Sequence, residues 1–190
     1  RKLELHDGIV SIGEQLVRGC KSLETLYIPR NFSQIPKWFA RDCSALKKVE
    51  CGGIVKTIGE GAFSGCTSLA SFDFGDTLET LNSGAFAGCT SLTVVHLPST
   101  VKTVENTVFM NCSSLRQLTI PSTVETVGRS ITRGCTALQF NVYKGTQYIG
   151  DAQNPYLIFM GRVDTSVKDI VIHEDTRFVW ANATFADLEA

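Results

Sequence analysis

Cysteine is the residue type with the greatest chemical potential in this 190-residue chain, because a thiolate can ligate a metal, form a disulfide or attack a substrate. The chain has seven cysteines: Cys20, Cys43, Cys51, Cys66, Cys89, Cys112 and Cys135. Zinc sites use closely spaced pairs such as C-x2-C, and the closest pair here, Cys43 and Cys51, is eight residues apart. We therefore expect no metal site and no cofactor.

The spacing of the cysteines predicts a repeat architecture. Six of them, all except Cys51, follow one another at intervals of 23 residues. A fixed period of this size is typical of solenoids and related arrays. Cysteines stacked in adjacent coils come within disulfide distance, but their side chains would point in parallel into a packed core. Free buried thiols are the expectation and stacked disulfides the alternative. Free thiols are unusual in the oxidising setting of a surface protein. Either burial of the thiols or an anaerobic source would explain how they remain free there.

Other residues capable of catalysis form no recognisable constellation. The three histidines, His6, His96 and His173, are far apart and lack ligand spacing. There is no G-x-S-x-G nucleophile elbow. The glycine-rich segment from Gly59 to Gly65 imitates a dinucleotide loop, but the next repeat carries the same pattern, so it belongs to the repeat itself. We expect a protein without enzymatic activity.

Composition excludes further classes of function. The 18 Lys and Arg residues nearly balance the 19 Asp and Glu residues, which argues against nucleic-acid binding. No apolar run approaches the roughly 18 residues of a membrane span, so no membrane insertion is expected. The sequence starts at Arg1 as if inside a structural element, which favours a fragment of a longer protein.

Several other positions share the 23-residue period. A leucine follows each of the six cysteines by three residues: Leu23, Leu46, Leu69, Leu92, Leu115 and Leu138. An aliphatic residue precedes each by eight: Ile12, Ile35, Ile58, Leu81, Val104 and Val127. Cys51 occupies a slot that is apolar in other units, including Ile28 and Phe74. These columns predict one continuous core shared by all units.

Each unit also predicts its own local structure. Alternation of apolar and polar residues, as in Leu118–Ile120, predicts a short strand. The segment Val55–Ile58 predicts a second short extended stretch, and Ala62-Phe63 a tight helical turn. The residue before each cysteine is Gly, Asn or Asp, the types that tolerate a positive φ, so we expect a left-handed cap there.

These periodicities define the expected organisation. Residues 1–190 form a single array, in which residues 3–140 contain six regular repeats of 23 residues. Residues 141–169 form an irregular repeat with a hairpin-like insertion, because Asn154-Pro155 predicts a turn and Leu157–Met160 a strand. Residues 170–190 form a truncated last repeat.

The strings IGEGAFSGCTSL, LNSGAFAGCTSL and LTIPSTVETVG resemble the BspA-like leucine-rich repeat family, found mainly in secreted and surface proteins of bacteria and some protozoan parasites. The resemblance extends from Leu3 to Leu188. It implies an α/β fold, namely a right-handed solenoid with a parallel concave β-sheet, short convex strands and short helical turns. It also implies adhesion or protein recognition outside the cell or at its surface, without catalysis.

The strand residues beside the inward-facing pair must point outward, and they define a candidate binding face. Seven strands stacked about 4.8 Å apart make a stripe roughly 30 Å long, and repeat proteins commonly bind partners on such a surface. We expect partner contacts from this concave face, with the aromatic side chains as the stronger anchors. The candidate residues are Tyr27, Lys48, Glu50, Asp73, Val94, His96, Thr119 and Phe140.

The sequence thus favours a non-enzymatic recognition or adhesion module of a secreted or cell-surface bacterial protein. Its partner is expected to be a protein, with host extracellular-matrix proteins as one candidate class. One alternative is a purely structural spacer or an intracellular scaffold. A remote alternative is a polysaccharide-active enzyme on a coiled β architecture, but the outward columns lack the cluster of Asp, Arg or Lys that such an enzyme needs.

Overall fold

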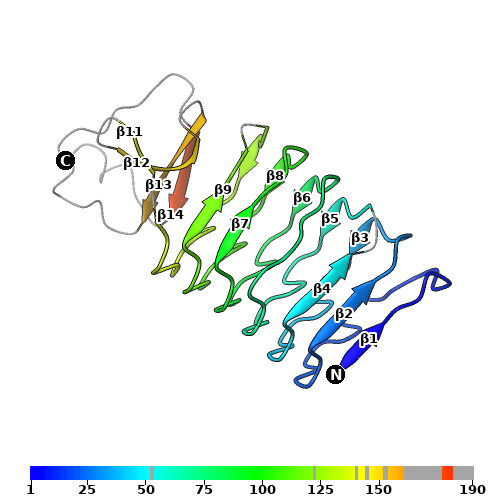
Figure 1. The fold of residues 1–190 in the computed structure, drawn as a ribbon. Coiled ribbons are helices and arrows are strands. Elements are labelled where there is room, and N and C mark those ends of the chain that lie inside the picture. The colour runs from blue at the N-terminus through cyan, green and yellow to red at the C-terminus, as the bar shows by residue number, and fades with distance from the viewer. Residues whose placement is uncertain are drawn as a thin grey trace.

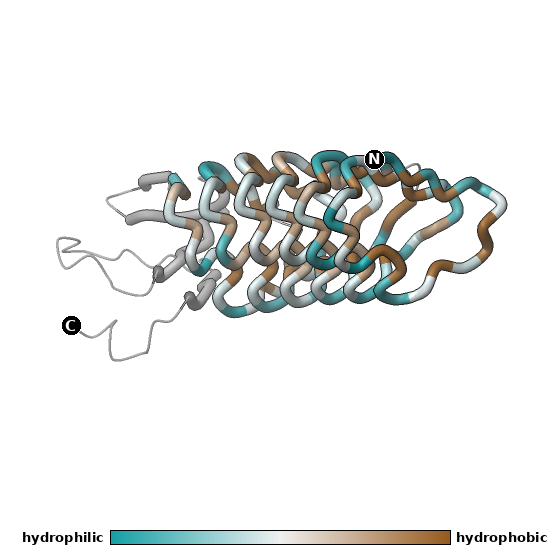
Figure 2. Tube along the Cα trace, turned by 90° about the horizontal axis from the view of Figure 1, so that it is seen from below, coloured by the Kyte–Doolittle hydropathy of each residue, from teal (hydrophilic) through white to brown (hydrophobic). Residues whose placement is uncertain are grey.

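The computed structural model describes residues 1–51, 54–121, 123–139, 141–143, 146–151, 154–160 and 177–181. Within the first 139 residues, the chain winds into successive coils stacked along one axis (Figures 1 and 2). Strand partners in neighbouring coils are 23 residues apart, as in Leu26 and Val49. The repeat length of the sequence is therefore the length of one coil.

One side of each coil carries what we call the front strands. These are β1 (Lys2–Glu4), β2 (Thr25–Ile28), β4 (Lys48–Cys51), β7 (Val94–His96) and β9 (Gln117–Thr119). They pair in parallel, β1 with β2, β2 with β4, and β7 with β9. Alternate residues face inward, so Leu26 and Val95 are buried while their neighbours in the strands face outward.

The front strands do not form the single seven-stranded stripe that the sequence predicts. In the fourth coil, residues 71–74 form no strand, which separates β1-β2-β4 from β7-β9. Phe72 occupies the inward slot that holds Val49 and Val95 in β4 and β7, and its larger ring packs 5.2 Å from Phe63 and 4.9 Å from Phe86. The Asp73 carboxylate also accepts a hydrogen bond from the Gly75 N–H, which turns the backbone away from the ladder.

A second set, the back strands, lies on another side of the coils (Figure 1). It comprises β3 (Gln34–Ile35), β5 (Thr57–Ile58), β6 (Thr80–Leu81), β8 (Thr103–Val104) and β10 (Thr126–Val127). They form one parallel sheet in the order β10-β8-β6-β5-β3. Each two-residue strand points an aliphatic side chain toward the core and a threonine or glutamine outward. The expected short strands of the second side are therefore present.

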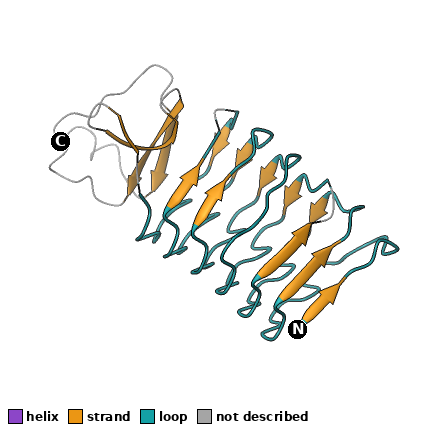
Figure 3. Cartoon of the chain, viewed as in Figure 1, coloured by secondary structure: helices purple, strands orange, loops and turns teal. Residues whose placement is uncertain are grey.

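The expected short helical turns are not confirmed: the described residues contain no helix, and the segments before the cysteines are runs of turns (Figure 3). The residue before each cysteine has a positive φ, between 61° at Asn111 and 79° at Gly134, as predicted. A second left-handed column, which the sequence analysis did not predict, lies four residues earlier and includes Trp38 and Thr107. Two left-handed residues per turn prevent continuation of a right-handed helix.

The turns also hydrogen-bond between coils, which gives them a ladder of their own. Within a coil, N–H groups bond three residues back, as Cys66 does to the Phe63 carbonyl oxygen at 3.2 Å. The intervening N–H groups donate to carbonyl oxygens of the next coil, as the Phe63 N–H does to the Ala85 carbonyl oxygen at 2.8 Å. Every second turn donor is thus used between coils rather than in an i to i−4 helix.

The core is continuous along the stack and contains the cysteine and leucine columns. Cys43, Cys66, Cys89, Cys112 and Cys135 are free and buried, whereas Cys20, in the first coil, is exposed. Cys51 is partly buried against the same core. A row of phenylalanines, Phe63, Phe86 and Phe109, stacks beside the cysteines, with ring centroids 5.4 and 5.9 Å apart. The free, buried thiols expected from the sequence are found at five of the six repeat positions.

Beyond Cys135, the last of the repeat cysteines, the strands change direction. These strands are β11 (Asn141–Tyr143), β12 (Thr146–Asp151), β13 (Asn154–Met160) and β14 (Arg177–Ala181). β11 pairs with β12 and β12 with β13 in antiparallel fashion, and β13 pairs in parallel with β14. The start of the predicted last repeat, residues 170–176, lies outside the described residues.

Candidate binding face

Tyr27 lies at the centre of the first three front strands. In the register of β1, β2 and β4 it stands between Glu4 and Glu50, and its side chain is half-buried. The next outward position, Thr25, stands between Lys2 and Lys48. The tyrosine is therefore flanked by a charged residue on each neighbouring strand.

The charges around Tyr27 neutralise one another in pairs. On β1, Lys2 forms an ion pair with Glu4, and on β4, Lys48 forms one with Glu50 at 2.5 Å. The hydrogen bond from Lys48 lowers the pKa of Glu50, and the hydrogen bond to Glu4 raises the pKa of Lys2. Because all four side chains are solvent-exposed or nearly so, these pairs contribute little to stability. Lysines therefore flank Thr25, and glutamates flank Tyr27, on the neighbouring strands.

The second part of the face comes from β7 and β9. The His96 imidazole nitrogen Nδ1 lies 3.0 Å from the Thr119 hydroxyl oxygen, which fixes the ring across the two strands. Val94, two residues before His96, keeps 37% of its surface exposed. This patch is less charged than the one around Tyr27.

The interruption in the fourth coil lies between these two patches. Asp73, one of the predicted contact residues, is exposed there but uses one carboxylate oxygen to cap Gly75. The structure thus brings Tyr27, Lys48 and Glu50 together on one patch, and Val94, His96 and Thr119 on another. Phe140, the remaining predicted residue, lies outside the described residues.

The outward columns provide no arrangement for metal or thiol chemistry. In the part of the chain that the structure describes, no three His, Cys, Asp or Glu side chains gather as metal ligands. His6 accepts a hydrogen bond from the Gly8 N–H at 3.1 Å and lies on the surface. Burial raises the pKa of the Cys66 thiol, and that of Cys89 to about 12, so neither is a thiolate near neutral pH.

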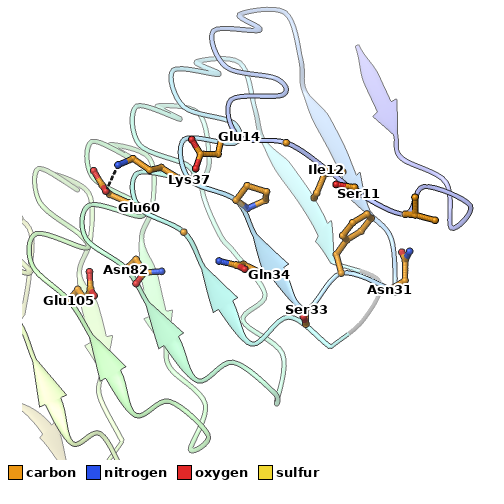
Figure 4. Close-up of a pocket in the computed structure, with 15 residues that line it drawn as sticks. Ser11, Ile12, Glu14, Asn31, Ser33, Gln34, Lys37, Glu60, Asn82 and Glu105 are labelled. Atoms are coloured by element: carbon orange, nitrogen blue, oxygen red, sulfur yellow. Dashed lines mark hydrogen bonds and ion pairs between the residues drawn. The ribbon is translucent and has the colours of Figure 1, made fainter.

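Sequence reasoning missed a groove on the side of the back strands. It has a volume of about 830 Å³ and lies between residues 10–14 of the first coil and residues 31–37 of the second, extending to Glu105 (Figure 4). The only trace of it in the sequence is Pro36, which takes a position held by Gly59, Asn82 and Glu105 in later coils. No periodic pattern reveals a groove, because it arises where one coil departs from the period.

Within the described ranges, no helix is long and apolar enough to cross a membrane. A search of curated proteins finds no match to this chain. Solved structures of bacterial leucine-rich repeat proteins are similar to it. A Bacteroides ovatus leucine-rich repeat protein is 24% identical over 95% of this chain and 42% of its own, with a TM-score of 0.68. A protein from Eubacterium ventriosum is 26% identical, covering 73% of this chain and 38% of its own, with a TM-score of 0.65.

A third similar structure is a leucine-rich cell surface protein of Faecalibacterium prausnitzii, 20% identical over 85% of this chain and 55% of its own, with a TM-score of 0.67. The chain thus spans less than half the length of the B. ovatus and E. ventriosum proteins. The model of the BspA type leucine rich repeat region matches residues 1–66 and 39–153, with six copies. Since this match covers most of the chain and its period is that of the observed coils, the protein belongs to the BspA-type leucine-rich repeat family.

Proposed function

We propose that this chain is a non-enzymatic protein-recognition segment of a secreted or cell-surface protein, and that it binds a partner protein through its front face. The front face comprises the outward side chains of β1, β2, β4, β7 and β9. The observation that carries the proposal is the placement of Tyr27 on the middle strand of three, between the Lys2–Glu4 and Lys48–Glu50 ion pairs.

The side chains of the front face can contribute to partner binding in different ways. A half-buried tyrosine has lost part of its conformational freedom before binding, so its ring and hydroxyl group can contribute at low entropic cost. The exposed pairs around it bring orientation and specificity rather than affinity. His96, held by Thr119, and the exposed Val94 form a second, more apolar patch.

The cell-surface setting is supported by the family and by the F. prausnitzii relative, which is a cell surface protein. Extracellular-matrix proteins are the first partner class to test. Suitable partners are large surfaces rather than small molecules, because the described front face carries outward side chains in parallel rows. Parallel rows suit an extended contact.

The test is surface binding of the purified chain to a panel of immobilised extracellular-matrix proteins, followed by variants on the partner that binds best. Tyr27→Ala combined with His96→Ala is expected to weaken binding about tenfold or more, the loss typical of an interface hot spot. The matched control is Lys102→Ala combined with Glu125→Ala, an exposed ion pair remote from the front strands. Equal affinity of the front-face and control variants contradicts the proposal, provided that both unfold at the temperature of the parent chain.

A further inference from the structure

The groove exists because the first coil does not pair with the second on the side of the back strands. In later coils the hydrogen bonds between back strands are regular. The Thr57 N–H donates to the Ser33 carbonyl oxygen at 3.1 Å, and the Gly59 N–H donates to the Ile35 carbonyl oxygen at 2.8 Å. The positions equivalent to Thr57 and Gly59 in the second coil are Gln34 and Pro36. Proline has no N–H, so the second of these bonds cannot form.

The bond equivalent to that of Thr57 is also missing. Among the described residues, no backbone hydrogen bond joins Gln34 to residues 9–14 of the first coil. Between residues 9–14 and residues 31–37, the only hydrogen bond runs from the Asn31 side-chain amide to the Ile9 carbonyl oxygen, at 2.7 Å. β3 therefore ends the back sheet with an unpaired edge, and this edge borders the groove. An unpaired strand edge is a template for another extended chain.

The groove has an acidic end. Glu14, Glu60 and Glu105 contribute three carboxylates to its lining and Lys37 one ammonium group (Figure 4). The ammonium group is already engaged, 2.6 Å from Glu60 and 4.2 Å from the centre of the Trp38 ring. In the described part of the chain, no cation pairs with Glu14, so this end carries an excess of negative charge.

The opposite end of the groove has apolar side chains beside the polar residues Ser11 and Asn31. Val10 is 92% exposed there, beside Ile12 and Phe32. Phe32 is the only aromatic residue in the lining, and it is buried, so no ring is available for a sugar to stack on. A volume of about 830 Å³ is within the range of sites that enclose a ligand.

From these observations we propose that the groove binds an extended segment of a partner protein that bears lysine or arginine. The segment adds as a strand to the unpaired edge of β3, where its backbone carbonyl oxygen accepts from the Gln34 N–H. A basic side chain lies against Glu14 and Glu60, and an apolar side chain contacts Val10 and Ile12. The proposal is independent of the proposed function, because none of the outward side chains of the front strands lines the groove.

The probe is a fluorescent, end-blocked hexapeptide, Lys-Thr-Val-Thr-Val-Lys, titrated with the chain and followed by anisotropy. Two matched peptides accompany it: one has glutamate in place of both lysines, and the other carries N-methyl groups on alternate backbone nitrogens. We expect binding of the basic peptide alone, weakened as salt rises because the carboxylates are solvent-accessible. N-methylation is expected to abolish binding by preventing strand addition.

The protein variants locate the peptide. Glu14→Gln combined with Glu60→Gln is expected to reduce affinity about tenfold, the effect of losing about 1.4 kcal/mol. The control Glu125→Gln, an exposed glutamate outside the groove lining, and the front-face variant Tyr27→Ala are expected to leave it unchanged. The proposal is overturned if the basic peptide does not bind at millimolar concentration, if the glutamate or N-methylated peptide binds equally, or if a neutral oligosaccharide displaces it. Loss of binding in Tyr27→Ala but not in the groove variant also overturns it.

Discussion

The Cys89 thiol donates a hydrogen bond of 3.2 Å to the carbonyl oxygen of Phe63, which lies 26 residues earlier and one coil away. The same bond recurs in each buried coil, from Cys43 to Val17, Cys66 to Ala40, Cys112 to Phe86 and Cys135 to Phe109. Cysteine suits this position because it is a small apolar side chain with a weak donor. The repeated thiol thus links consecutive coils and does not act as a reactive group.

Thiol labelling should separate the first coil from the rest. In the folded chain, a water-soluble alkylating reagent at pH 8 is expected to modify Cys20 alone within minutes, because Cys20 is exposed while the other repeat cysteines are buried. Cys51 is partly buried, and burial raises its pKa to about 12, so it should react slowly. Peptide mass spectrometry measures the pattern. Labelling of all seven cysteines in denaturant is the control, and rapid native labelling of Cys89 would contradict the structure.

Alkaline pH should destabilise the fold through the buried thiols. Burial raises the pKa of Cys89 to about 12 from an ordinary value of 9.0, so the folded state holds its proton where the unfolded state loses it. This contribution to stability is complete below pH 9 and falls by about 1.4 kcal/mol per pH unit as the pH rises from 9 toward 12.

The measurement compares the parent chain with Cys89→Ala by chemical unfolding at pH 8 and at pH 11. The variant lacks the titrating thiol, so the stability difference between the two proteins should shrink as the pH rises. A difference that stays constant would show that the Cys89 thiol does not titrate on unfolding.

Thr107 should be a site of stored backbone strain. Its φ of 55° places a β-branched residue in the left-handed region, where the same column has Gly61 and Gly84. Replacement by glycine removes a cost of about 1–2 kcal/mol and adds an entropic cost of about 0.5–1 kcal/mol. Thr107→Gly is therefore expected to raise the melting temperature slightly. The control Thr103→Gly, in strand β8, should lower it, and equal losses in both variants would argue against strain at Thr107.

The aromatic cluster beneath the fourth coil should be the energetic centre of the core. The Phe86 ring lies 4.9–5.9 Å from the rings of four others, Phe63, Phe72, Phe74 and Phe109. Phe86→Ala is expected to lower the free energy of unfolding by about 3–5 kcal/mol, and the loss of the ring contacts should lower it further.

Phe39 is the matched control for Phe86, because it is equally buried and has no ring partner in the described residues. Denaturant unfolding of Phe39→Ala and Phe86→Ala measures the difference. The loss at Phe86 should be larger by about 1 kcal/mol or more, and equal losses would show that the ring contacts add nothing.

The length and register of the coil can be predicted from the residue pattern alone, because every coil must present the same side chains to the same core. The 23-residue spacing of Cys66 and Cys89 established the register, and the Gly, Asn or Asp residue before each cysteine located the left-handed turn. The outward position of Tyr27 followed from alternation along a strand. These features are periodic, so six copies reinforce one another.

The departures from the period depend on packing between coils and become visible in three dimensions. Phe72 removes its coil from the front ladder because its ring packs against Phe63 and Phe86, residues from two different coils. Pro36 borders the groove, and because it has no N–H it cannot make the bond that joins neighbouring coils at this position later in the chain. Helical turns were expected, but the alternate turn N–H groups bond to the next coil instead. Each outcome depends on contacts between coils, which a single repeat does not contain.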